Sequence, residues 1–272
     1  MHFVEPNSSG RVAVGDIKMY YEIRGQGDPL FMIMGLGGHS LDWGPVLPGL
    51  LAERYQVILF DNRGSGRSDQ PPGKLPISLM AKDAAGLMDA LGIQSAHVLG
   101  GSMGGMIALQ MALDYPDHID RLLLGATTAG GRSRIFPQPE IEKYFIPRSD
   151  LTAHDYLLWT SPACYPPEFI ASHPETIEEK ISANLAHPGT LESYLAQLEA
   201  FRTFQVDERL HEIRAPTLVM TGNRDVLIPP KNSYLLSSRI PGAKMRVIDG
   251  AGHTFWISHP KETARIVTDF LG

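Results

Sequence analysis

The segment Gly100-Gly101-Ser102-Met103-Gly104-Gly105 follows the apolar run His97-Val98-Leu99 and precedes a second apolar stretch. This order predicts a strand, a sharp turn and a helix, with Ser102 at the tip of the turn. Gly100, Ser102 and Gly104 satisfy the pattern G-x-S-x-G, in which the two glycines let strand and helix approach closely. The helix then directs its N-terminus at whatever the serine hydroxyl attacks. Ser102 is therefore a candidate nucleophile, although a serine that only caps the helix would leave the same local pattern.

The composition is that of an ordinary globular protein. Its 272 residues, 43% hydrophobic and 20% charged, fit one large domain or one domain with an insertion. A net charge of −6 argues against nucleic acid and anionic membranes as partners. The single cysteine, Cys164, excludes an internal disulfide, and residues 1–10 lack the apolar run of a secretory signal. We therefore expect a cytoplasmic protein with a small-molecule substrate; the oligomeric state is not predicted.

Short apolar runs alternate with helical patterns along most of the chain. An alternating run predicts an antiparallel strand near a sheet edge, at 17–23. Buried parallel strands are expected at 30–34, 57–60, 97–99, 122–124, 217–220 and 245–248. Helices are expected at 46–54, 79–91, 103–113, 232–238 and 261–271. This order predicts an α/β fold whose mostly parallel central sheet is covered by helices on both faces.

The alternation stops between residues 127 and 206. This stretch contains many prolines and amphipathic segments at 176–185 and 191–204, but no convincing buried strand. We interpret it as a helical cap inserted over the carboxyl edge of the sheet. The predicted organisation is a core formed by 1–126 and 207–272, with 127–206 as the cap.

A nucleophilic serine needs a base, and the base works best when a carboxylate fixes its tautomer. Asp225 lies on a loop just after the apolar run 217–220, and His253 lies just after the run at 245–248. Both therefore fall at the same sheet edge as Ser102, where ligands bind in open α/β folds. Asp249 is the rival acid, but it closes a strand and is better placed to cap the loop. Asp225 and His253 are the predicted acid and base.

An acyl-transfer enzyme also needs donors that face the developing oxyanion. The glycine-rich segment 34–38 follows an apolar run, so the predicted donors are the backbone N–H groups of Leu36 and Met103. A flexible turn is the alternative interpretation of that segment. The same loop fails as a dinucleotide fingerprint, and the chain has no Walker lysine or metal-spaced cluster of histidine and cysteine. No cofactor and no metal are expected.

The chain resembles the α/β-hydrolase fold superfamily along nearly its whole length. The matching segments are 35–38, 61–69, 100–105, 216–225 and 250–253, in the family's order of Ser, Asp and His. The resemblance implies a catalytic triad of Ser102, Asp225 and His253, and a structural turn at 61–69. Ser102 excludes the haloalkane dehalogenase branch, which uses an aspartate nucleophile. Met34 departs from the family, because many members have a histidine there.

The leading functional hypothesis is a cofactor-free serine hydrolase that cleaves small or medium carboxylic esters. The chain is also similar to 3-oxoadipate enol-lactonases, so a lactone is an alternative substrate. A meta-cleavage C–C hydrolase is less favoured, because Thr254 stands where that group has a tryptophan. A hypothesis of another class is a hydrolase-like ligand receptor, which would turn over slowly and bind a protein partner through its cap.

Overall fold

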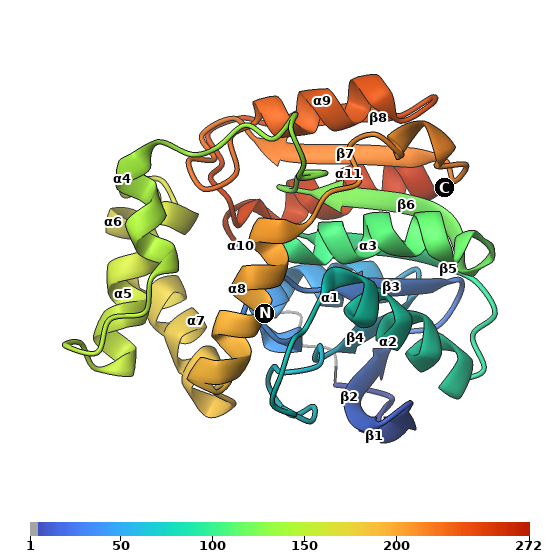
Figure 1. Ribbon diagram of the computed structural model, residues 1–272, viewed down its shortest axis with the longest axis horizontal. Coiled ribbons are helices and arrows are strands. Elements are labelled where there is room, and N and C mark those ends of the chain that lie inside the picture. Colours follow the sequence, from blue (N-terminus) through green and yellow to red (C-terminus); the bar gives the residue numbers. More distant parts are fainter. Residues whose placement is uncertain (1–4) are drawn as a thin grey trace.

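The computed structural model describes residues 5–272, and one eight-stranded sheet runs through it (Figure 1). Strands β1 and β2 are antiparallel, as are β2 and β4, and every other neighbouring pair is parallel. The spatial order is β1-β2-β4-β3-β5-β6-β7-β8. The strands are β1 Ser8–Val14, β2 Ile17–Arg24, β3 Pro29–Ile33, β4 Gln56–Phe60, β5 Ala96–Gly101, β6 Ile119–Gly125, β7 Thr217–Gly222 and β8 Lys244–Ile248. The predicted α/β fold is confirmed.

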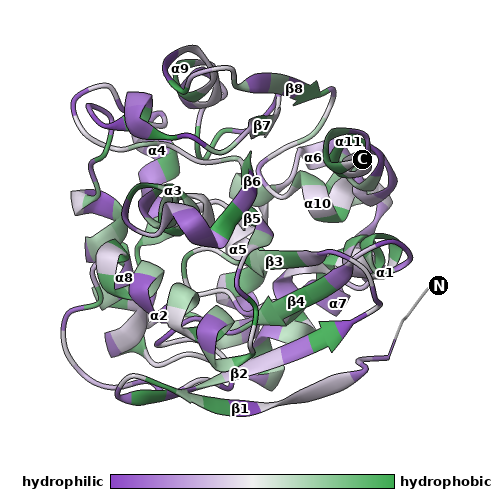
Figure 2. Cartoon of the chain, turned by 90° about the vertical axis from the view of Figure 1, so that its right-hand side faces the viewer, coloured by the Kyte–Doolittle hydropathy of each residue, from purple (hydrophilic) through white to green (hydrophobic). Residues whose placement is uncertain are grey.

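Helices cover both faces of the sheet (Figure 2). One face carries α2 (Ile77–Ala90), α3 (Met103–Asp114) and α9 (Lys231–Arg239), and the other carries α1 (Val46–Ala52) and α11 (Pro260–Leu271). Each face has its own cluster of buried side chains, so the central strands have no exposed face. Shorter elements include α10 Phe255–Ser258 and the 3-10 turns Ser40–Trp43, Pro116–His118, Lys143–Phe145 and Leu210–Glu212.

Two edge strands differ from the expectation. Strand β1 was not predicted, because its sequence SSGRVAV contains few apolar residues and most of its positions are at least partly exposed. It forms a hairpin with β2, which moves β2 away from the edge. Strand β8 was expected to be buried, but it ends the sheet and only Ile248 is buried. The exposed charges of Lys244 and Arg246 suit such an edge, because charged side chains discourage pairing with another chain.

The segment 127–206, called the cap segment below, is helical and lies to one side of the sheet (Figure 1). Prolines occupy the first turns of three of its helices, where the missing N–H costs nothing. The division of the chain into a core (1–126 and 207–272) and a helical cap (127–206) stays a prediction. Its helices are α4 Pro139–Glu142, α5 Ala153–Cys164, α6 Pro167–Ser172, α7 Pro174–Ala186 and α8 Leu191–Thr203.

The cap segment has two kinds of packing. Tyr165, Ile177 and Ile181 form a small buried cluster of its own. Helix α8 instead contributes Leu198 and Phe201 to the main core on the α2/α3 face. Over residues 5–272, no helix combines the length and apolar character that a membrane crossing requires. Residues 1–4, which belong to the N-terminal stretch considered for a secretory signal, lie outside the described part.

Candidate active site

Ser102 lies on the turn between β5 and α3, as the sequence predicts. Its backbone adopts φ 56°, in the left-handed region that non-glycine residues rarely occupy, and its N–H donates to Gly125 O over 2.8 Å. A Cβ on Gly100 would collide with the backbone of Gly104, and one on Gly104 would collide with Ile33 O. Strand and helix therefore approach as closely as the glycine pattern predicts. Strain of this kind gathers at functional sites.

Asp225 and His253 are joined by a buried hydrogen bond of 2.8 Å between Oδ2 and Nδ1. The other carboxylate oxygen, Oδ1, accepts from the backbone N–H groups of Leu227 and Ile228, each over 2.9 Å. These three bonds fix the carboxylate, and the carboxylate in turn orients the imidazole ring. The rival, Asp249, is exposed and accepts a hydrogen bond of 2.6 Å from Asn223 instead.

Ser102 and His253 line the same cavity, which has a volume of about 280 Å³. Within the described residues the serine hydroxyl makes no hydrogen bond to the ring. Such bonds are often long or poorly aligned before substrate binds. Trp256 packs beside the ring, with its centroid 6.0 Å from that of His253.

The loop that follows β3 lies directly against the serine turn. A Cβ on Gly35 would come within 2.8 Å of Ser102 Cβ and 3.2 Å of Met103 N. Leu36 therefore follows a residue that touches the turn, and Met103 supplies one of the first N–H groups of α3, which have no partner inside their own helix. Both predicted oxyanion donors thus belong to backbone that surrounds Ser102. Leu36 also lines the cavity.

One side chain of the cap segment holds this loop, and the sequence did not reveal it. Gln197 on α8 is fully buried, and its Oε1 accepts from Gly37 N over 2.8 Å. Its Nε2 donates to Arg63 O over 2.9 Å and to Ser65 Oγ over 3.0 Å. A glutamine in an amphipathic helix looks like surface, so no local signal could have identified it.

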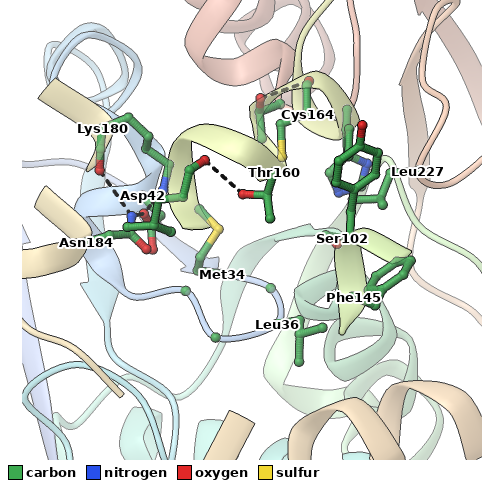
Figure 3. A pocket seen from close by; sticks show the side chains of 18 of the residues that line it. Met34, Leu36, Asp42, Ser102, Phe145, Thr160, Cys164, Lys180, Asn184 and Leu227 are labelled. Carbon is green, nitrogen blue, oxygen red and sulfur yellow. Dashed lines mark hydrogen bonds and ion pairs between the residues drawn. The ribbon is translucent and has the colours of Figure 1, made fainter. Parts of the chain in front are cut away.

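The rest of the cavity wall is mostly apolar, with one polar corner (Figure 3). Side chains from the cap segment, among them Phe145, Tyr194 and Phe201, face the loops at the carboxyl ends of the strands. The polar corner consists of Asp42, Lys180 and Asn184, which the sequence analysis also missed. Lys180 and Asn184 lie on α7, where charged and amide groups are ordinary surface residues.

Burial shifts the pKa of several groups around the cavity. Desolvation lowers the pKa of Lys180 to about 7, and the contact with the Asp42 carboxylate acts in the opposite sense. Desolvation also lowers the pKa of His39 to about 4, so that its ring is neutral at physiological pH. The thiol of Cys164 lines the cavity, but burial raises its pKa to about 12, which keeps it protonated and unreactive. No group of three or more potential metal-binding side chains occurs among residues 5–272.

Comparison with known proteins identifies the family of this chain. The alpha/beta hydrolase fold family matches residues 28–260. The chain belongs to that family. It is 36% identical to a protein of Azorhizobium caulinodans named "Putative carbamate hydrolase RutD", over 95% of this chain and 96% of the relative.

Two solved structures show how this alpha/beta hydrolase compares with others of its fold. An enol-lactonase from Burkholderia xenovorans superposes with a TM-score of 0.85 at 25% identity, covering 96% of this chain and 99% of the other. A thermophilic esterase from Thermogutta terrifontis has a TM-score of 0.81, also at 25% identity, and covers 97% of this chain and 98% of its own. The relatives therefore include proteins named for three kinds of substrate: carbamates, lactones and esters.

Proposed function

We propose that this alpha/beta hydrolase cleaves small or medium carboxylic esters through an acyl-enzyme on Ser102, without a cofactor. The observation that carries the proposal is the buried bond between Asp225 Oδ2 and His253 Nδ1. Because Nδ1 is engaged, Nε2 is the ring nitrogen left to accept a proton. A serine hydroxyl needs such a base to become a nucleophile.

The reaction follows from the positions of these groups. His253 Nε2 takes the proton as Ser102 Oγ attacks the carbonyl carbon, and Asp225 stabilises the imidazolium that forms. The negative charge develops on the carbonyl oxygen and is met by the N–H groups of Leu36 and Met103. His253 then gives its proton to the leaving alcohol. Water, activated by the same histidine, releases the acid from Ser102.

A second candidate substrate is a carbamate, and the 36% identical relative is what favours it. The same attack on a carbamate carbonyl gives a carbamoyl-enzyme, in which the nitrogen lone pair reduces the electrophilicity of the carbonyl. Deacylation is then the slower step. Lactones are the third candidate, since ring opening needs the same nucleophile and base.

Covalent labelling tests the nucleophile. An aryl phosphonate should modify the protein stoichiometrically, peptide mapping should place the adduct on Ser102, and Ser102→Ala should abolish both labelling and turnover. Ser65 is a buried serine of the core whose hydroxyl accepts from Gln197, so Ser65→Ala is a matched control and should label normally. An adduct on any other serine would overturn the assignment.

A panel of phenyl esters, phenyl carbamates and lactones then identifies the bond that is cleaved. The phenyl esters and phenyl carbamates both release phenol, so a higher kcat/KM for the esters supports the ester proposal. The reverse order would make the carbamate the substrate class. Turnover that is very slow on every compound, together with tight binding of one of them, would favour the receptor hypothesis instead.

A further inference from the structure

The polar corner of the cavity joins the core to the cap segment. Asp42 follows the loop after β3, and its Oδ1 accepts from both Lys180 Nζ and Asn184 Nδ2 on α7. Its Oδ2 accepts from the backbone N–H of His39 over 2.7 Å. The Asp42 side chain is only 4% exposed and that of Lys180 is 23% exposed. All three side chains nevertheless line the cavity that contains Ser102.

The hydrogen bonds inside this corner do not use all of its capacity. An ammonium carries three donors, and the bond from Lys180 to Asp42 uses one of them. A carboxylate oxygen can accept two hydrogen bonds, and Oδ2 of Asp42 accepts the one from His39. Two side chains that line the cavity, Lys180 and Asp42, therefore keep capacity for a further donated and a further accepted hydrogen bond. Figure 3 shows Lys180, Asn184 and Asp42 together on one side of the pocket, with Ser102 across from them.

With Lys180 protonated, the corner carries no net charge. Asp42 and Lys180 neutralise each other, and the nearby His39 ring is uncharged at neutral pH. A ligand anion placed here would lie next to the Asp42 carboxylate, and a ligand cation would lie next to Lys180. In a cavity with apolar walls, either arrangement buries an uncompensated charge, which is costly. A neutral group with its own donor and acceptor avoids that cost.

We propose that Asp42 and Lys180 form a subsite for a carboxamide-type group at the end of the substrate remote from the bond that is cleaved. The carbonyl oxygen of that group accepts from Lys180 Nζ, and its N–H donates to Asp42 Oδ2. The primary role of Asn184 is to hold Asp42. This assignment rests on the proposed function, because it takes Ser102 as the other end of the substrate.

Isosteric substrates can test the subsite directly. The series consists of phenyl esters of one chain length whose acyl groups end in a carboxamide, a methyl ketone, a carboxylate or a branched alkyl group. The derivatives of adipic acid provide one such series, and the glutaric and pimelic homologues place the terminal group one methylene nearer or farther. We expect the carboxamide to have the highest kcat/KM at its best length, since it alone supplies both a donor and an acceptor. The ketone, which only accepts, should follow.

Variants decide whether the corner causes that preference. The double variant Asp42→Asn with Lys180→Met keeps the corner neutral, so it leaves no unpaired buried charge that would unfold the protein. It should lower the ratio of carboxamide to alkyl kcat/KM by about tenfold, which corresponds to the net loss of one or two hydrogen bonds. Lys180→Met alone should act in the same direction. Lys261→Met, a matched change on the exposed surface of α11, should leave the ratio unchanged.

Each other outcome contradicts the proposal. Equal losses on carboxamide and alkyl esters would mean that the ion pair only fastens α7 to the core. A preference of the wild type for the carboxylate would make the corner an anion site. If the alkyl ester is the best substrate and the variants do not change the ratio, the corner binds nothing. Phosphonate labelling of Ser102 is read separately, so failure of the subsite is distinguishable from failure of the proposed function.

Discussion

The core and the cap segment position their side chains around the cavity by different means. In the core, Ser102, Asp225 and His253 each follow a parallel strand within a few residues, so the carboxyl edge of one sheet fixes all three. The cap segment has only three buried residues in a cluster of its own. Its side chains reach the site through long-range contacts, chiefly those of α8 and α7.

This difference indicates how the two regions can divide the work. A sheet edge holds groups to the tolerance that bond making requires, whereas helices held by a few contacts can change the shape of a pocket without disturbing the chemistry. Gln197 is the exception, because it belongs to the cap segment but bonds the loop that faces Ser102. If the division holds, losses should be largest at the core triad, smaller at Gln197 and smallest at the aromatic residues of the cap segment.

The largest effect is expected at the acid. Asp225→Asn should lower kcat by a factor on the order of 10⁴, since an amide at this position favours the wrong tautomer of His253. Substrate binding should change little, because the carboxylate faces the histidine. Asp249→Asn is the matched control and should cost far less, as Asp249 bonds Asn223 on the surface. Steady-state kinetics on a phenyl ester checks both, and the reverse ranking would make Asp249 the third member of the triad.

The next effect is expected where the cap segment meets the loop. Gln197→Met keeps the length of the side chain but removes the acceptor of the Gly37 N–H. Loss of an oxyanion donor costs about 100- to 1000-fold in kcat, and a donor that is only less well held should cost about 10- to 100-fold. KM should change by less than about threefold, since the effect falls on the transition state.

Binding of a transition-state analogue shows whether Gln197 positions the loop at Gly37 or only attaches the cap segment to the core. Binding of a trifluoromethyl ketone should weaken in Gln197→Met in parallel with kcat/KM. Ser65→Ala removes one partner of Gln197 Nε2 and leaves the Gly37 bond in place, so its kcat should stay near that of the wild type. If both variants lose stability alike and neither loses kcat, Gln197 only attaches α8 to the core.

The same division explains what the sequence could and could not predict. The strands, the serine turn and the positions of Asp225 and His253 depend on residues close together in the chain, and apolar periodicity and glycine placement report such relations. The bond from Gly37 to Gln197 joins residues 160 apart, and that from Lys180 to Asp42 joins residues 138 apart. Periodicity carries no information about such pairs. The burial predicted for strand β8 was wrong for a related reason, since its apolar residues do not reveal that it lies at the end of the sheet. The roles of the site residues stay predictions.

A third prediction concerns the loss of stability at acid pH, which depends on whether the cap segment covers His39. His39 is buried beside Lys180 and His187, and desolvation lowers its pKa to about 4. An unfolded histidine has a pKa of about 6.5, so below that pH the unfolded state binds the proton more readily than the folded state. Stability should therefore fall as the pH drops from about 6.5 to about 4, by up to about 3 kcal/mol.

Urea denaturation at pH 7 and at pH 4.5 measures this loss. His39→Gln should lose less stability than the wild type between the two values, and the exposed His211→Gln should lose as much as the wild type. Paired carboxylates such as Glu22 and Asp61, whose pKa values are lowered, contribute mainly below about pH 4. If His39→Gln has the same acid dependence as the wild type, the ring is already solvated and the cap segment does not cover it.

The smallest effect is expected at the cap aromatics. Phe201 lines the cavity, whereas Trp159 packs against the lining residue Tyr144, with the two ring centroids 4.7 Å apart. Phe201→Leu should therefore raise KM for longer acyl chains several-fold and shift the preferred length, and Trp159→Leu should do so less. Turnover of phenyl acetate should stay within about tenfold in both, because a short acyl group does not fill the space that Phe201 borders and uniform binding losses act on KM. A loss on acetate as large as that of Asp225→Asn would mean that the cap segment supplies a catalytic group. Its histidines would then be the residues to test, namely His154, which pairs with Glu178 on the surface, His173 and His187.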